Sequence, residues 1–73
     1  MKPHTINSSI FSLVCYDVST GLLELEYRNG TSRRWLSVPV RVYHTFCKAS
    51  DPDAYFRTSI DGHYTSLRGK LSF

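Results

Sequence analysis

The sequence predicts an α+β fold, in which a three-stranded antiparallel meander is followed by two helices packed on one face of the sheet. Three observations predict it. Residues 22–28 alternate apolar and charged side chains, Asn29-Gly30 follows as a strong hairpin signal, and from Val40 the apolar period lengthens to that of a helix. The expected order is β-β-β-α-α in one domain, because 73 residues is the size of a single small domain.

The first strand is predicted over residues 10–17, which are rich in β-branched and aromatic side chains. Its alternation is imperfect, because Phe11, Leu13 and Cys15 fall on one face of a regular strand, and Ile10, Val14 and Tyr16 fall on the other. Either both faces are covered or a β-bulge shifts the register. A turn follows, in which Gly21 can adopt a positive φ.

Residues 22–28 form the clearest predicted strand. Its expected inward face is Leu23, Leu25 and Tyr27, and its expected outward face is Glu24, Glu26 and Arg28. Asn29-Gly30 predicts a type I′ turn, which needs positive φ at both central residues. The third strand is then expected over residues 31–37, since Pro39 cannot continue a central ladder.

Two helices are predicted after the sheet. The first begins at Val40 and ends near Ala49, with an apolar stripe opposite a polar face that includes Arg41 and Lys48. The second begins at Asp51, which can cap free backbone N–H groups. Gly62 is its expected end.

The ends of the chain are expected to contribute less. Residues 1–8 are polar and predict a flexible arm, and residues 9–64 form the single domain. Residues 65–73 carry few apolar side chains and predict a basic tail, or alternatively a short extra strand.

The order and spacing of several short motifs resemble the KTSC domain, a small module of bacterial proteins. The matching residues are Ser9, Phe11, Tyr16-Asp17, Leu23, Leu25, Tyr27, Asn29-Gly30, Val38-Pro39, Val42-Tyr43, Ala49, Tyr55-Phe56, Ile60 and Tyr64. The resemblance covers roughly residues 9–64. The family takes its name from the C-terminus of some lysyl-tRNA synthetases, so the resemblance implies RNA binding by analogy.

The sequence departs from the family pattern at three places. The family's central Tyr-x-Tyr falls on Arg33-Arg34-Trp35, so arginine replaces the first aromatic residue. Asp51 and Asp53 stand where the family tends to have Ser and Gly, and Arg57 stands where Asn is common.

Composition favours a folded, mildly basic protein. The chain is 41% hydrophobic and 14% aromatic, and its formal net charge is +3. A positive charge favours approach to nucleic acid or another anionic surface. Cys15 and Cys47 show no CxxC spacing, and no secretory signal or membrane-spanning run is visible. We therefore expect a cytoplasmic protein with two reduced thiols and no membrane partner.

The predicted binding surface, for RNA or for another partner, consists of Arg28, Arg33, Arg34, Trp35, Arg41 and Lys48. Aromatic faces stack on bases, and cations follow the phosphates of single strands. Strand alternation leaves two alternatives open. Either Leu36 points into the core, and Trp35 lies on the open face with Arg33, or Trp35 is a core residue and Arg33 must extend back to water.

No reaction, metal or cofactor is expected. The aspartates fall at predicted turns and helix ends, where capping explains them, and the histidines and cysteines match no zinc spacing. The alternative to RNA binding is a protein-interaction module or a homodimer, which would use the same sheet face or an edge strand. The expected state is a monomer or a weak homodimer.

Overall fold

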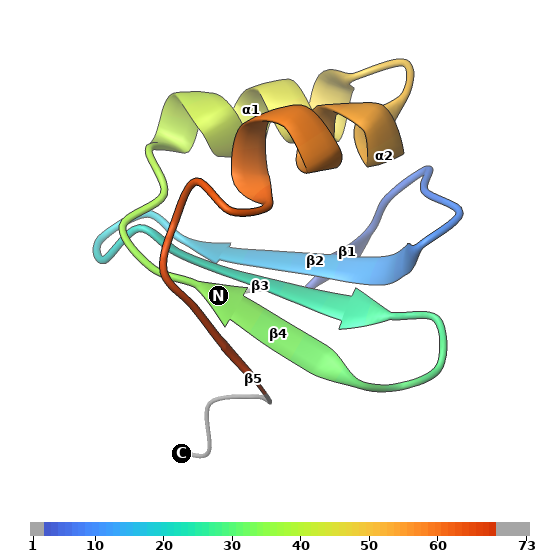
Figure 1. The fold of residues 1–73 in the computed structure, drawn as a ribbon, viewed down its shortest axis with the longest axis horizontal. Helices are drawn as coiled ribbons and strands as arrows, with labels where there is room; N and C mark the ends of the chain where they lie inside the picture. Colours follow the sequence, from blue (N-terminus) through green and yellow to red (C-terminus); the bar gives the residue numbers. More distant parts are fainter. Residues whose placement is uncertain (1–2, 69–73) are drawn as a thin grey trace.

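Two helical segments cover one face of an antiparallel sheet in the computed structural model, which describes residues 3–68 (Figure 1). The elements are β1 (His4–Thr5), β2 (Phe11–Asp17), β3 (Leu22–Tyr27), β4 (Ser32–Trp35), α1 (Val40–Lys48), α2 (Pro52–Tyr55), the π-helical turn η1 (Phe56–Ile60) and β5 (Ser66–Arg68). The α+β class and the two helical segments on one side agree with the prediction. Opposite them the sheet has a second face, which we call the open face.

The prediction of three strands is wrong, because the sheet has five strands in the order β1-β2-β3-β4-β5. Strand β1 comes from the segment expected as an arm, and it pairs His4 with Val14. Strand β5 comes from the predicted basic tail and pairs Arg33 with Arg68. The chain therefore returns after the helices to add an edge strand beside β4. Residues 69–73 of the predicted tail lie outside the described residues.

A β-bulge in β2 explains the imperfect alternation of that strand. The register between β2 and β3 shifts between Phe11 and Leu13. The extra residue brings Phe11 and Val14 to the same face, where both are fully buried. The bulge alternative is thus confirmed.

The β3–β4 hairpin forms where Asn29-Gly30 predicted it, but the turn is not type I′. Only Gly30 has a positive φ, of 92°, and Asn29 does not. The Gly30 N–H donates to the Tyr27 carbonyl at 3.0 Å, and the Tyr27 N–H donates to the Thr31 carbonyl at 2.7 Å. This pattern is the three-residue loop with glycine in the left-handed position. The Asn29 side chain stabilises it by accepting from the Thr31 N–H at 3.0 Å.

Both helical segments begin where the sequence predicts. Asp51 caps α2 by accepting from the Ala54 N–H at 3.2 Å, and Pro52 occupies the first turn. The segment then widens into η1, which ends at Ile60, before Gly62 with its φ of 79°. The π-helical turn places Phe56 and Ile60, both buried, against the sheet.

Trp35 belongs to the core, with 1% of its surface exposed. Its ring meets Phe56 edge-on, with centroids 5.3 Å apart and an interplanar angle of 84°. The alternative that placed Trp35 on the open face is therefore wrong. The other fully or largely buried core residues come from strands and helices alike: Phe11, Val14, Leu23, Leu25, Val38, Val42, Phe46, Phe56 and Ile60.

Candidate nucleic-acid interface

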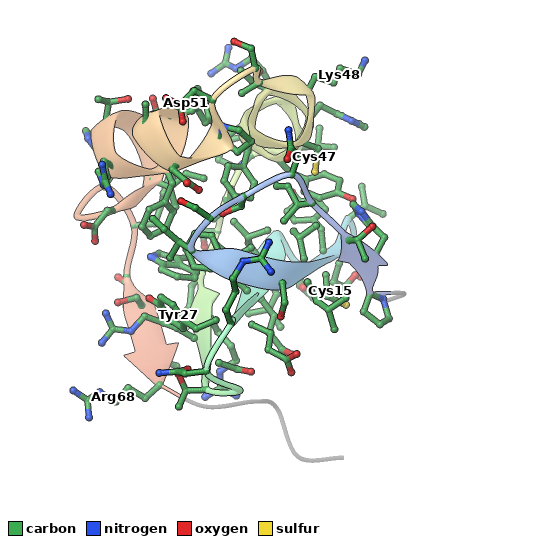
Figure 2. The ribbon with its side chains drawn as sticks, turned by 90° about the vertical axis from the view of Figure 1, so that its right-hand side faces the viewer. Cys15, Tyr27, Cys47, Lys48, Asp51 and Arg68 are labelled. Carbon is green, nitrogen blue, oxygen red and sulfur yellow. The ribbon has the colours of Figure 1, made fainter. Side chains whose placement is uncertain are left out.

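The six residues predicted to bind RNA or a partner do not form one surface. Trp35 lies in the core, where its ring cannot stack on a base. Arg41 and Lys48 are exposed on the outer side of α1. Figure 2 shows Lys48 of α1 and Arg68 of β5 at opposite corners of the molecule. The remaining residues are Arg28, Arg33 and Arg34, and these also lie at different places in the fold.

Arg28 is engaged in holding the fold. Its Nε and Nη2 atoms both donate to the Ser8 carbonyl, at 3.1 and 2.5 Å. The Ser8 hydroxyl oxygen accepts from the N–H groups of Ile10 and Phe11, each at 3.0 Å. Arg28 thus fixes the segment that leads into β2, which leaves its guanidinium less available to a ligand.

The same segment is tied to the second helical segment through Asp53. This carboxylate accepts from the hydroxyls of Ser8 and Ser9 and from the Ser9 N–H, the last at 3.0 Å. These hydrogen bonds hold the pKa of Asp53 below its ordinary value. The departure from the family pattern at position 53 therefore has a structural role.

Arg34 projects from the open face, opposite Glu24 on β3. Its Nε atom is shielded from solvent and has no hydrogen-bond partner among the described residues. The open face therefore combines an arginine with glutamates and is not the basic surface that the sequence suggested.

Arg33 and Arg68 form the one juxtaposition of cations that the sheet register creates within residues 3–68. They stand directly opposite each other on β4 and β5. Arg33 is also opposite Leu25, a fully buried residue, so both arginines project to the side of the sheet that carries the helices. Like charges in this position destabilise a sheet unless an anion lies between them.

An aromatic ring lies next to the arginine pair. Tyr27 is two residues beyond Leu25 on the same face of β3, so it is the diagonal neighbour of Arg33 and within reach of it. The Tyr27 ring is half-buried, with its centroid 5.0 Å from that of the Phe11 ring, so only part of it is open to a ligand.

Sequence reasoning missed Arg68, which fell in a segment expected to be a tail. One signal was available in the sequence. Leu67 lies between the polar residues Ser66 and Arg68, and this alternation is compatible with the short extra strand that was the alternative to a tail. The position of Arg68 opposite Arg33 depends on the pairing of β4 with β5, two strands that are separated in the sequence by both helical segments. No local sequence pattern indicates that pairing.

A second cluster of polar and aromatic side chains lies between β1, β2 and α1. The rings of Tyr16 and Tyr43 stack with centroids 4.5 Å apart. The Tyr16 hydroxyl donates to the Val38 carbonyl, and the Tyr43 hydroxyl bonds His4 Nε2, both at 2.6 Å. Burial raises the pKa of both tyrosines. Their hydroxyls are occupied in joining elements of the fold.

The thiols are not arranged as nucleophiles. Burial raises the pKa of Cys15, with a further contribution from Glu24, and burial also raises the pKa of Cys47. Figure 2 shows Cys47 with the helices and Cys15 on the other side of the sheet. The carboxylate of Asp17, two residues after Cys15, accepts from the Ser19 hydroxyl at 2.7 Å within its own turn.

Residues 3–68 contain neither a metal-binding cluster nor a membrane-spanning helix. No three histidine, cysteine, aspartate or glutamate side chains in this part of the chain gather closely enough to hold a metal ion. Among the helices described, none is long and apolar enough to cross a membrane.

Comparison with known proteins identifies a family and a fold. The family model described as KTSC domain matches residues 7–64. The structure is similar to the crystal structure of a KTSC domain protein from Yersinia pestis, with a TM-score of 0.88 and 23% sequence identity. The match covers 94% of this chain and 97% of that one. No curated protein matches the chain.

Proposed function

This chain belongs to the KTSC domain family, and from that premise we propose that it is a small non-enzymatic module that binds single-stranded RNA weakly. Binding uses the phosphate backbone and takes place at Arg33 and Arg68. We further propose a cytoplasmic setting, which the two free thiols on opposite sides of the sheet support.

The observation that carries the proposal is the direct opposition of Arg33 and Arg68 on adjacent strands. Guanidinium groups bind phosphate oxygens through paired hydrogen bonds. A phosphate between the two arginines would relieve their repulsion and satisfy their donors. Neither side chain has a hydrogen bond or ion pair within residues 3–68 that would compete, whereas the Arg28 guanidinium is bonded to Ser8.

The expected affinity is low. Two phosphate contacts give a log–log slope of about −1.4 against salt concentration, because each single-strand contact contributes about −0.7. Stacking adds little, since Trp35 is buried and Tyr27 presents only part of its ring. Such a module would raise the RNA affinity of a larger partner rather than select a sequence alone.

Fluorescence anisotropy of a labelled single-stranded RNA at low salt tests the proposal. The double variant Arg33→Gln, Arg68→Gln should lose most of the binding. The matched control Arg41→Gln, Lys48→Gln removes the same charge from the outer face of α1 and should bind nearly as well as the parent. Equal losses in both variants would show that only net charge matters and would contradict the assignment.

A further inference from the structure

The open face of the sheet has a pattern that is complementary to itself. One row of side chains crosses four strands, and the register places Cys15 opposite Glu24, Glu24 opposite Arg34, and Arg34 opposite Leu67. Read from β2 to β5, the row is apolar, acidic, basic and apolar. We propose that a second copy of this chain docks on the open face, with a two-fold axis parallel to the strands between β3 and β4.

The two-fold geometry follows from the register. Rotation about that axis carries β3 of one copy over β4 of the other and β2 over β5. Because Glu24 and Arg34 lie at the same height, Glu24 comes to lie over the partner's Arg34, and Arg34 over the partner's Glu24. The same rotation brings Leu67 over the partner's Cys15. Such an interface is isologous and closes as a dimer.

Shape agrees with this arrangement. Leu67 is an exposed large hydrophobic residue, 44% of whose surface is accessible. On the other half of the open face is a hollow of about 190 Å³, lined by Pro3, Leu13, Val14, Cys15, Glu24 and Glu26. The rotation places each protruding Leu67 above the partner's hollow. A projection and a recess on opposite halves of one face are what a two-fold interface requires.

Two polar side-chain atoms of β4, at the centre of the proposed interface, have no hydrogen bond within residues 3–68. The Ser32 hydroxyl oxygen and the Arg34 Nε are shielded from solvent, and neither has a hydrogen bond among the described residues. Ser32 is only 9% exposed although it lies on the open face, opposite Glu26. Buried polar groups are nearly always bonded. Because both atoms are already covered within one copy, they gain an acceptor from the partner only when their side chains turn outward on docking.

Charge and area also favour a second copy. The chain carries a net charge of +3, but the central row of the open face pairs one acid with one base. The exposed cations Arg41 and Lys48 lie on the outer side of α1, so they stay apart in the dimer. The molecule measures 33 Å along its longest axis and 22 Å along its shortest. A face of that size approaches the roughly 800 Å² per partner of a standard interface.

Charge reversal distinguishes the proposed dimer from effects within one copy. Glu24→Arg and Arg34→Glu should each shift the sedimentation of the protein to that of a monomer, with dimerisation weakened at least about tenfold. Mixing the two variants should restore a dimer, because every pair across the interface is then of opposite charge. Arg41→Glu is the matched control and should leave the dimer intact. Wild-type protein that stays monomeric at high concentration, or a mixture that forms no heterodimer, overturns the proposal.

A disulfide trap covers the case in which a charge variant fails to fold. Leu67→Cys in a Cys47→Ser background places a thiol over the partner's Cys15. Within one copy the two positions are three strand spacings apart, about 14 Å, which is too far for a disulfide. Mild oxidation should therefore give a reducible covalent dimer, and adding Cys15→Ser should abolish it. Absence of the covalent dimer, or its persistence without Cys15, contradicts the two-fold arrangement.

Discussion

Arg33 and Arg68 stand directly opposite each other on two neighbouring strands, with their side chains on the helix-bearing side of the sheet. The arrangement costs stability, because like charges at opposed positions repel. A binding site often carries such a local cost, which the ligand relieves. Stability and RNA binding should therefore respond in opposite directions when the pair is broken.

Arg68→Gln should raise the free energy of unfolding by about 0.2–1 kcal/mol, because it removes the repulsion and keeps most of the side chain. The same variant should weaken RNA binding. Urea unfolding and RNA anisotropy measure the two effects. Arg41→Gln is the control, since Arg41 lies on α1 and is not part of a cross-strand pair. A destabilised Arg68→Gln variant would show that the arginines are not in conflict.

Trp35→Ala should lower the free energy of unfolding by about 3–5 kcal/mol, because it opens a large cavity beside Phe56. For a chain of 73 residues this is a large part of the total stability. Urea unfolding measures this loss of stability. If the alanine variant does not fold, Trp35→Phe should give a smaller loss that can still be measured. Val18→Ala, at a residue that is 73% exposed, should change little. A native-like stability in Trp35→Ala would contradict the burial of the indole.

Asp53 should make the fold sensitive to acid. Its folded pKa lies below the ordinary value of 3.8 because the Ser8 and Ser9 hydroxyls bond the carboxylate. The stability it contributes is therefore fully present above that ordinary value and is lost as the pH falls through the folded pKa. Thermal unfolding between pH 2 and 7 should show a smaller acid-induced loss in Asp53→Asn than in the parent.

The matching variant for this effect is Ser9→Ala, which removes one hydroxyl that donates to the Asp53 carboxylate. Its acid-induced loss should also be smaller than that of the parent. If Asp53→Asn and the parent lost stability in parallel across the whole pH range, the hydrogen bonds from Ser8 and Ser9 would not stabilise the charged form.

Gly21→Ala should destabilise the fold more than Gly62→Ala. Both glycines have positive φ, of 75° and 79°, so an alanine is strained at either position. Only at Gly21 would the new Cβ also meet the backbone, at 3.1 Å from the Val38 carbonyl oxygen. We expect a difference of about 1 kcal/mol or more in the free energy of unfolding. Equal losses in the two variants would mean that the Val38 backbone does not lie close to Gly21.

Much of the fold follows from local patterns. The β3–β4 hairpin, α1 and the capped start of α2 have their own signals in turn chemistry, alternation and capping. The short edge strands have none, because His4–Thr5 and Ser66–Arg68 contain two and three residues and become strands only by pairing with β2 and β4. Pairings between distant segments depend on the assembled core rather than on local sequence.

The site was harder to predict than the fold. Alternation placed Arg33 and Trp35 on one face, but it could not say which face is covered. Burial of Trp35 decides the matter, and it carries Arg33 to the helix side, where Arg68 arrives from the far end of the chain. Arg28 looked like a surface cation, and its bonds to the Ser8 carbonyl appear only once the strands are paired.

An NMR titration of the labelled protein with a short single-stranded RNA tests the proposed function most directly. The account predicts that the backbone amides of β4 and β5 around Arg33 and Arg68 shift progressively, that those on the outer side of α1 do not, and that added salt reverses the shifts. Shifts confined to α1, or no shifts at low salt, would contradict the assignment of RNA binding to this pair of arginines.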